Sequence, residues 1–398
     1  MTGTLGPTMT PRSVPTITRV LSLAAALVVV AAACSSSHPK AAGPTTSTLP
    51  PGEVTTTTTP DAQTVVIAAT GGNIDAYLSI TPYTRQRVVA AGTGPDGTVP
   101  HGQVCFVPDG SRRFVIAETR TPPGGAATAG WGLYQLTGDE IGNFRVRRTA
   151  GWDSPGAPSA DAPSTYGCTF LPDGRLLTTD VGNQRTGAPT GRLVEWFAPF
   201  DGPTVTSCVI AGDLGTPLGL ATDADGAIYL AAARAPSAGV WQYKGSFPKD
   251  ATACASTIPP TSTLLVPGGT NGLSAPTAVA IAPSNKAMAV TSAPDGLIVA
   301  FDLDGTNPLV VQTKSSTGAA SPFGIVVAPD GSIIYTDIGL AADPKGVLTP
   351  GDKAGALLVI DTSSGSAAPP AVMDRGLDAP DGLGLYVPGG GGGAASKV

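Results

Sequence analysis

The fold follows from one stretch of the 398-residue chain, which reads Tyr166-Gly-Cys-Thr-Phe-Leu-Pro172-Asp173-Gly174-Arg-Leu-Leu-Thr-Thr-Asp180. It consists of an apolar run, a Pro-Asp-Gly sequence and a second apolar run. Pro presets its own φ and Gly accepts a positive φ, so Pro-Asp-Gly between two apolar runs is typical of a tight turn. The stretch therefore predicts a β-hairpin.

The same pattern recurs along the chain. Its first apolar run starts with a small residue six times, at Gly102, Gly167, Gly219, Ala278, Gly324 and Gly382. Two further apolar segments follow each hairpin, which makes four strands per unit. Six units of about 54 residues predict an all-β fold, a six-bladed β-propeller over residues 64–388 with four antiparallel strands per blade.

The two ends of this region complete each other. Residues Thr64 to Ala91 supply the second, third and fourth strands of a unit but not the first. The missing first strand is the segment Leu383 to Val387 near the C-terminus. We expect both ends to share the closing blade, because this arrangement closes the ring and removes two exposed sheet edges.

The repeat resembles the NHL-repeat propellers and the SMP-30/gluconolactonase-like six-bladed group. The resemblance rests on Pro-x-Gly, the Pro-Asp-Gly turn and the Thr179-Asp180 end of the second strand. It implies a divalent metal, calcium or similar, held at the channel by Glu, Asn and Asp. Asp381 matches the Asp, whereas no Glu or Asn directly precedes a repeat glycine.

Candidate site residues come from the propeller geometry. The first strand of each blade starts at one mouth of the central channel, and the second strand returns to that mouth. The candidate ligands there, for a metal or a polar molecule, are His101, Glu118, Tyr166, Asp180, Asp337 and Asp381. The alternative is structural, since an Asp at a strand end commonly accepts hydrogen bonds from its own loop. No catalytic residue is assigned.

The first residues carry an export signal. Arg12 and Arg19 precede a 14-residue apolar run, Val20 to Ala33, which is too short to span a bilayer. Val30-Ala-Ala-Ala-Cys34 resembles a lipobox, so the chain is similar to a bacterial, actinobacterial-type lipoprotein with signal peptide 1–33 and lipidated Cys34. The alternative is an ordinary secretory signal. We expect a protein anchored by lipid to the outer face of the cytoplasmic membrane.

Low-complexity segments flank the propeller. Residues 34–63 are rich in Ser, Thr and Pro, which predicts a disordered tether, and residues 389–398 form a Gly-rich tail. Only 13% of the residues are charged, the net charge is −6, and no basic patch offers phosphate binding. We therefore expect no nucleic-acid partner. Neither Gly-x-Ser-x-Gly nor His-Glu-x-x-His occurs.

Four cysteines remain besides Cys34, and four cysteines permit three pairings. Cys105 and Cys168 lie on predicted innermost strands of adjacent blades, and Cys208 and Cys254 lie on outer segments of the next adjacent pair. In an oxidising compartment these positions favour the disulfides 105–168 and 208–254.

The sequence leaves three functions open. The first is a surface-anchored propeller that binds a small-molecule or protein ligand through the loops Thr119 to Ala129, Trp152 to Thr165 and Ile338 to Ala354. The second is a metal-dependent hydrolase of the SMP-30/gluconolactonase type. The third is a protein like the quinoprotein sugar dehydrogenases, which is suggested by the shared propeller class alone.

Overall fold

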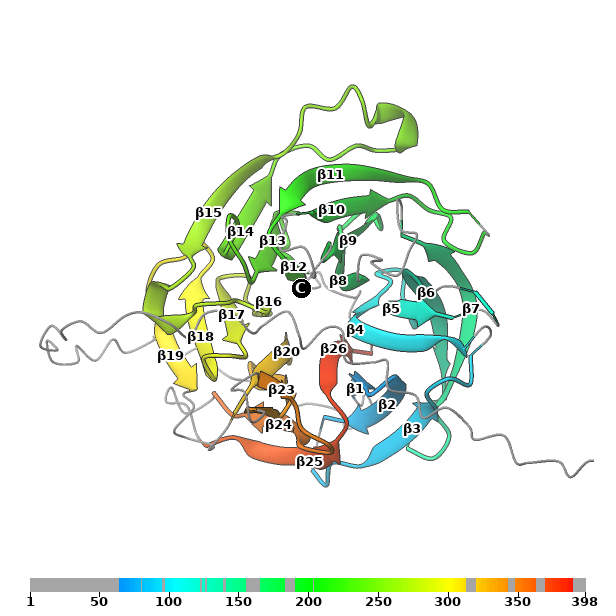
Figure 1. Ribbon diagram of the computed structural model, residues 1–398, viewed down its shortest axis with the longest axis vertical. Helices are drawn as coiled ribbons and strands as arrows, with labels where there is room; N and C mark the ends of the chain where they lie inside the picture. The colour runs from blue at the N-terminus through cyan, green and yellow to red at the C-terminus, as the bar shows by residue number, and fades with distance from the viewer. Residues whose placement is uncertain are drawn as a thin grey trace, which may run out of the picture.

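A computed structural model describes residues 64–388 except 80, 95–96, 122–123, 126, 139–140, 155–164, 183–189, 203, 313–319, 343–347 and 363–368. The predicted signal peptide (1–33), the lipidation site Cys34, the tether (34–63) and the tail (389–398) lie outside the described residues. The described chain forms six four-stranded antiparallel sheets in a ring (Figure 1). This confirms the predicted six-bladed β-propeller.

Each blade is described from its innermost strand outward. Blade 1 contains β26 (Pro380–Tyr386), β1 (Val65–Thr70), β2 (Asn73–Leu78) and β3 (Arg85–Val89). Blade 2 contains β4 (Val99–Phe106), β5 (Arg113–Arg120), β6 (Thr128–Thr137) and β7 (Arg145–Asp153). Blade 3 contains β8 (Thr165–Phe170), β9 (Leu176–Asp180), β10 (Gly191–Trp196) and β11 (Ser207–Leu214).

The remaining blades follow the same order. Blade 4 contains β12 (Pro217–Thr222), β13 (Ile228–Ala232), β14 (Gly239–Lys244) and β15 (Thr261–Pro267). Blade 5 contains β16 (Ala278–Ile281), β17 (Ala287–Ser292), β18 (Leu297–Asp302) and β19 (Leu309–Gln312). Blade 6 contains β20 (Pro322–Val327), β21 (Ile333–Asp337), β24 (Gly355–Ile360) and β25 (Ala371–Leu377).

Blade 6 also carries an inserted hairpin, β22 (Leu340–Ala342) with β23 (Leu348–Pro350), between its second and third strands. Two short 3-10 helices, η3 (Ala251–Ala253) and η4 (Thr270–Gly272), lie in the loops on either side of β15. None of the helices within the described residues has the length and hydropathy that a membrane span requires.

The ring is closed as expected. β26 from the C-terminal end pairs with β1, and Figure 1 shows them side by side in red and blue. The innermost strands contact one another in the order β26, β4, β8, β12, β16, β20 and back to β26. This contact is so close that a Cβ atom on Gly382 would lie 1.7 Å from the carbonyl oxygen of Gly102. Glycine is required there because no side chain fits.

The hydrophobic core is divided among the six interfaces between neighbouring blades. Successive residues of one strand enter different interfaces, since side chains alternate between the two faces of a sheet. On β1, Val65 and Ile67 pack with blade 2, whereas Val66 packs with blade 6. A seventh buried cluster lies at the axis and is described below.

The Thr-Asp end of the repeat has a structural use. The hydroxyl of Thr179 accepts a hydrogen bond from the backbone N–H of Gly167 at 2.7 Å and donates one to the carbonyl oxygen of Leu218, also at 2.7 Å. The hydroxyl thereby ties β9, the second strand of blade 3, to the innermost strands of blades 3 and 4. Thr291 of blade 5 makes the same two contacts, to Ala278 and Phe323.

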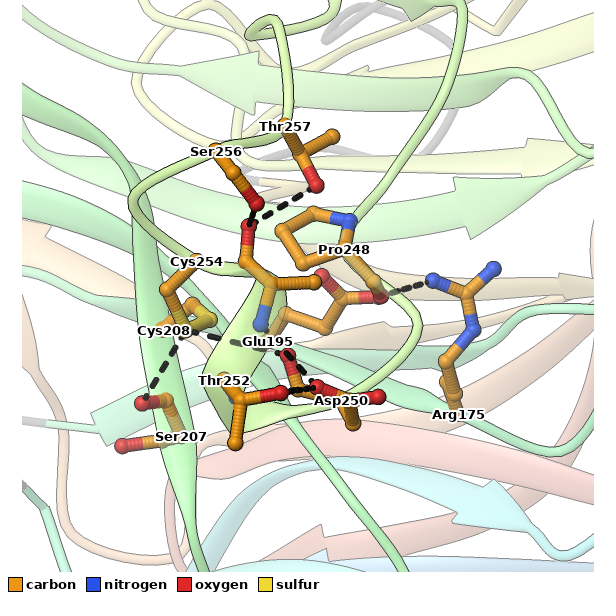
Figure 2. Close-up of a disulfide and its surroundings, with 11 residues drawn as sticks. Arg175, Glu195, Ser207, Cys208, Pro248, Asp250, Thr252, Cys254, Ser256 and Thr257 are labelled. Atoms are coloured by element: carbon orange, nitrogen blue, oxygen red, sulfur yellow. Dashed lines mark hydrogen bonds and ion pairs between the residues drawn. A yellow bond between two sulfur atoms is a disulfide. The ribbon is translucent and has the colours of Figure 1, made fainter.

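Two disulfides join blades, and both match the predicted pairs. Cys105 on β4 is bonded to Cys168 on β8, next to the axis. Cys208 on β11 is bonded to Cys254, which follows η3 in the β14–β15 loop, as Figure 2 shows. Disulfides are compatible with an exported protein.

A charged side chain near the second disulfide also ties the β14–β15 loop to blade 3 (Figure 2). Arg175 Nη1 donates a hydrogen bond to Glu195 Oε1 at 2.7 Å and another to the carbonyl oxygen of Pro248 in the β14–β15 loop. Glu195 pairs with Cys208 in the β10–β11 register. Burial raises the pKa of Glu195 to about 7, although Arg175 acts in the opposite direction. The loop of blade 4 is therefore held on blade 3 by a covalent bond and a charged contact.

Candidate functional site

An apolar cluster fills the channel mouth at which the innermost strands begin. We call this end of the channel the loop mouth. The residues directly before the six repeat positions lie there: His101, Tyr166, Leu218, Thr277, Phe323 and Asp381. Tyr166 belongs to blade 3 and Phe323 to blade 6, which face each other across the axis. Their rings meet edge to face, with centroids 5.4 Å apart and planes at 89°. Because opposite blades touch here, side chains close the channel.

Other blades extend this cluster. Leu218 of blade 4 and Ala293 of blade 5 pack against the two rings, and so does Leu340 of the β22–β23 hairpin. Tyr166 and Phe323 are 1% and 3% exposed. The loop mouth is therefore closed chiefly by apolar side chains from blades 3 to 6.

Asp381 and Tyr166 meet beside this cluster. Asp381 Oδ2 accepts a hydrogen bond from the backbone N–H of Gly102 at 3.1 Å, and the Tyr166 hydroxyl donates to the Asp381 carbonyl oxygen. Asp381 retains partial exposure but lies deep in the ring, and this burial raises the pKa of its carboxyl to about 7. Burial also raises the pKa of Tyr166 well above its ordinary value. A neutral phenol and a half-ionised carboxyl are thus expected near pH 7.

His101 lies on β4 next to Gly102. Its Nε2 is 3.2 Å from the hydroxyl of Thr119, and its Nδ1 is buried without a hydrogen-bond partner among the described residues. Burial lowers the pKa of His101 to about 4. The imidazole is therefore neutral at physiological pH and carries no charge that would attract an anion.

Glu118 and Asp180 are engaged inside their own blades. Glu118 is fully buried and accepts two hydrogen bonds from Arg148, at 2.8 and 2.9 Å, and one from the Tyr134 hydroxyl at 2.7 Å. Asp180 forms an ion pair with Arg192 and accepts from the backbone N–H of Gly182. Burial raises the pKa of Asp180, and the arginine opposes this shift. Each carboxylate thus has a cationic partner in its own blade, two strands away for Glu118 and on the adjacent strand for Asp180.

Asp337 is held by backbone N–H groups of its own loop and of the residue before β20. Its Oδ1 accepts hydrogen bonds from the backbone N–H groups of Ser321 and Gly339, both at 2.9 Å. Burial raises the pKa of this carboxyl, against the effect of the two N–H donors. These contacts are those of an Asp that shapes a loop.

The candidate carboxylates do not gather around one point. Across the described parts of 64–388, no three side chains of His, Cys, Asp or Glu lie close enough together to hold a metal ion. The structure brings Tyr166, Asp381 and the backbone next to His101 together, while Glu118, Asp180 and Asp337 are bound elsewhere. These residues do not fit the three-ligand metal site that the resemblance implies.

A cavity lies at the opposite end of the channel. The sequence analysis placed no candidate site at this end. It has a volume of about 530 Å³ and opens where the innermost strands end, at turns that include Ala224, Pro283, Asn285, Pro329 and Val387. We call this end the turn mouth. The base of the cavity is formed by the residues that directly follow the repeat positions: Gln103, Cys168, Leu220, Val279, Ile325 and Leu383.

Gln103 spans the base of this cavity. Its amide donates a hydrogen bond to the carbonyl oxygen of Leu220 at 2.7 Å and accepts one from the backbone N–H of the same residue at 3.0 Å. It also accepts from the N–H of Cys168 at 3.3 Å. A side chain of blade 2 therefore satisfies the free edge of blade 4, as a neighbouring strand would.

The sequence does contain a signal for Gln103. The residue after the repeat position is apolar or cysteine in five units and glutamine in one. A single polar residue in an otherwise apolar column of a repeat indicates a specific polar contact, because a buried polar group requires a hydrogen-bond partner. Sequence reasoning that considered only ionisable groups missed it.

Comparisons with known proteins concern the fold. No protein-family model and no curated protein matches the chain. Among solved structures, the nidogen/laminin complex aligns at 13% identity and a TM-score of 0.51, covering 82% of this chain and 99% of that chain. The neighbours also include a periplasmic gluconolactonase from Pseudomonas aeruginosa, at 14% identity, 81% and 99% coverage and a TM-score of 0.49.

A further neighbour is a putative 6-phosphogluconolactonase from Bacteroides fragilis, at 12% identity, 83% and 99% coverage and a TM-score of 0.46. At such identities the likeness extends to the fold alone. The chain is thus a six-bladed β-propeller with gluconolactonase-like structural neighbours.

Proposed function

We propose that the chain is an exported lipoprotein, anchored to the cell envelope through Cys34, whose propeller binds a ligand or protein partner at the loop mouth. The export signal, the lipobox-like sequence and the tether support the location. The two disulfides are compatible with it. A Cys34→Ala variant is expected to leave the membrane fraction, and full retention of this variant would contradict the anchor.

One observation carries the choice of binding over hydrolysis. Of the four carboxylates that sequence reasoning placed at the loop mouth, Glu118 and Asp180 are paired with Arg148 and Arg192. Asp337 and Asp381 accept hydrogen bonds from backbone N–H groups and do not meet as a catalytic pair. General acid–base and metal-assisted hydrolysis need ionisable groups presented to the substrate. At this mouth the axis is filled by apolar side chains instead.

The partner surface that we propose consists of loops on a rigid scaffold. β5 ends at Arg120 and β6 begins at Thr128, so the loop between them lies at this mouth. The β22–β23 hairpin projects from blade 6 at the same mouth. Ala341 and Ala342 on this hairpin are exposed. Recognition commonly uses such loops because their sequence varies without affecting the core.

Photo-crosslinking in the native envelope tests the partner surface. A photoreactive residue at Ala342, on the loop side, is compared with one at Asp330, in an exposed turn at the other mouth. We expect a discrete crosslinked species from position 342 alone. Equal crosslinking from both positions, or none from 342, would contradict the proposed surface.

Lactone hydrolysis tests the hydrolase alternative. The purified chain, Asp381→Ala and the matched exposed variant Asp378→Ala are assayed with added calcium. The binding function predicts turnover equal to the buffer control for all three proteins. Hydrolysis by the wild type and by Asp378→Ala that is lost in Asp381→Ala would overturn the proposal and favour the hydrolase.

A further inference from the structure

The cavity at the turn mouth is closed at its inner end. Gln103 crosses its base through hydrogen bonds to Leu220, and the Tyr166–Phe323 contact closes the axis beyond. A molecule in the cavity would therefore enter and leave at the turn mouth. The volume of the cavity, about 530 Å³, falls within the usual range for small-molecule sites, about 300–1,000 Å³.

The wall of the cavity is mainly apolar. It is lined by aliphatic and aromatic residues of the innermost strands, among them Phe106, Phe170, Ile281 and Val326. Removal of apolar surface from water is favourable, so such a wall favours an apolar molecule.

The polar groups in the wall are neutral. Thr169 Oγ1 and Thr222 Oγ1 lie 2.8 Å apart on β8 and β12, and the Gln103 amide lies one layer deeper. The lining, which lies within the described residues, contains no Asp, Glu, Lys, Arg or His. A charged group placed there would lose its hydration and gain no counter-ion.

We propose that this cavity is a binding site for a neutral, mainly apolar small molecule with one hydrogen-bonding group. The apolar part lies along the innermost strands, and the polar group faces Thr169 and Thr222. This site is separate from the loop mouth and does not depend on the partner proposed there. Loss of either function leaves the other testable.

Two fluorescent probes that differ by one charge test the proposal. N-phenyl-1-naphthylamine is neutral, and 8-anilinonaphthalene-1-sulfonate adds one sulfonate to the same skeleton. Each is titrated into the mature chain, residues 34–398, carrying Cys34→Ala, so that neither the apolar signal peptide nor an attached lipid binds the probe. We expect saturable binding of one neutral probe per chain, and binding of the sulfonate at least about tenfold weaker. Equal affinity for both probes, or no saturable binding of the neutral one, would overturn the proposal.

A matched pair of variants locates the probe. Ala282→Trp places a large ring at the turn mouth, where Ala282 lines the cavity. Ala342→Trp makes the same change on the exposed hairpin at the loop mouth. We expect Ala282→Trp to weaken binding of the neutral probe at least about tenfold and Ala342→Trp to leave it unchanged. The opposite order, or an equal effect, would place the probe elsewhere and contradict the site.

A competition measurement does not depend on the folding of any variant. Bound N-phenyl-1-naphthylamine is displaced with decan-1-ol and, separately, with decanoate at equal concentrations below micelle formation. We expect the neutral alcohol to displace the probe and the carboxylate to need at least about tenfold more. Displacement by decanoate at the same concentration would contradict the preference for a neutral ligand.

Discussion

Tyr166 and Phe323 meet edge to face across the propeller axis, with ring centroids 5.4 Å apart, although 157 positions separate them in the chain. Tyr166 also donates a hydrogen bond to the Asp381 carbonyl oxygen, so blades 1, 3 and 6 are joined at one point. This contact closes one mouth of the channel and leaves the cavity open at the other. The two ends of the channel are therefore chemically different.

Removal of one ring should destabilise the whole domain. Phe323→Ala leaves a void between blades 3 to 6, and truncation of a buried Phe typically costs about 3–5 kcal/mol of the free energy of unfolding. Urea denaturation measures the loss. Ile258→Ala, at a side chain that is 83% exposed, is the control and should change stability by less than about 0.5 kcal/mol. A loss no larger than that of the control would show that the contact does not hold the blades together.

Much of the fold was predictable, because the repeat is written in local sequence. Pro-Asp-Gly turns and apolar runs set the hairpins, and placing Cys105 and Cys168 on adjacent innermost strands was enough to pair them. The Tyr166–Phe323 contact was not predictable, since it depends on which blades face each other across a closed ring. The burial of Glu118 depends on Arg148, two strands away, and no local pattern marks that pair.

The stability of the protein should depend on the ionisation of Asp381. Burial raises its pKa from 3.8 to about 7, so between these pH values the folded protein keeps a proton that the unfolded chain has released. The contribution of Asp381 to the free energy of unfolding therefore falls as the pH rises from about 4 to about 7, by at most about 1.4 kcal/mol per pH unit.

Urea denaturation of the wild type and Asp381→Asn across this range tests the dependence. The amide stays neutral and retains an oxygen for the Gly102 N–H. The difference in the free energy of unfolding between the two proteins should therefore change with pH only between about pH 4 and about pH 7. Contributions from His101 and Glu195 are common to both proteins and cancel. A difference that stays flat with pH would show that Asp381 ionises normally.

The Glu118–Arg148 pair should stabilise blade 2. Arg148→Met leaves the carboxylate of Glu118 buried, and we expect a loss of about 3 kcal/mol, at the lower end of the usual range because Arg120 Nε remains 3.8 Å from Glu118. The double variant with Glu118→Gln should recover most of the loss. Arg147→Met, on the exposed neighbour, is the control, and an equal effect of both arginine changes would refute the buried pair.

The outer disulfide should protect the β14–β15 loop from proteolysis. A variant with Cys208→Ala and Cys254→Ala is treated with trypsin, for which Lys249 is an exposed site in this loop. We expect cleavage after Lys249 several-fold faster than in the wild type. Without the disulfide, only non-covalent contacts such as the Arg175 hydrogen bond to the Pro248 carbonyl oxygen hold the loop on blade 3. Unchanged cleavage would mean that these contacts hold the loop without the disulfide.

The most direct test of the two different channel ends is a crystal structure of residues 34–398 with Cys34→Ala, bound to N-phenyl-1-naphthylamine. We expect the probe at the turn mouth, against the innermost strands and beside Thr169 and Thr222, with the Tyr166–Phe323 contact intact. A probe seated instead at the loop mouth beside Asp381, with the two rings moved apart, would contradict it.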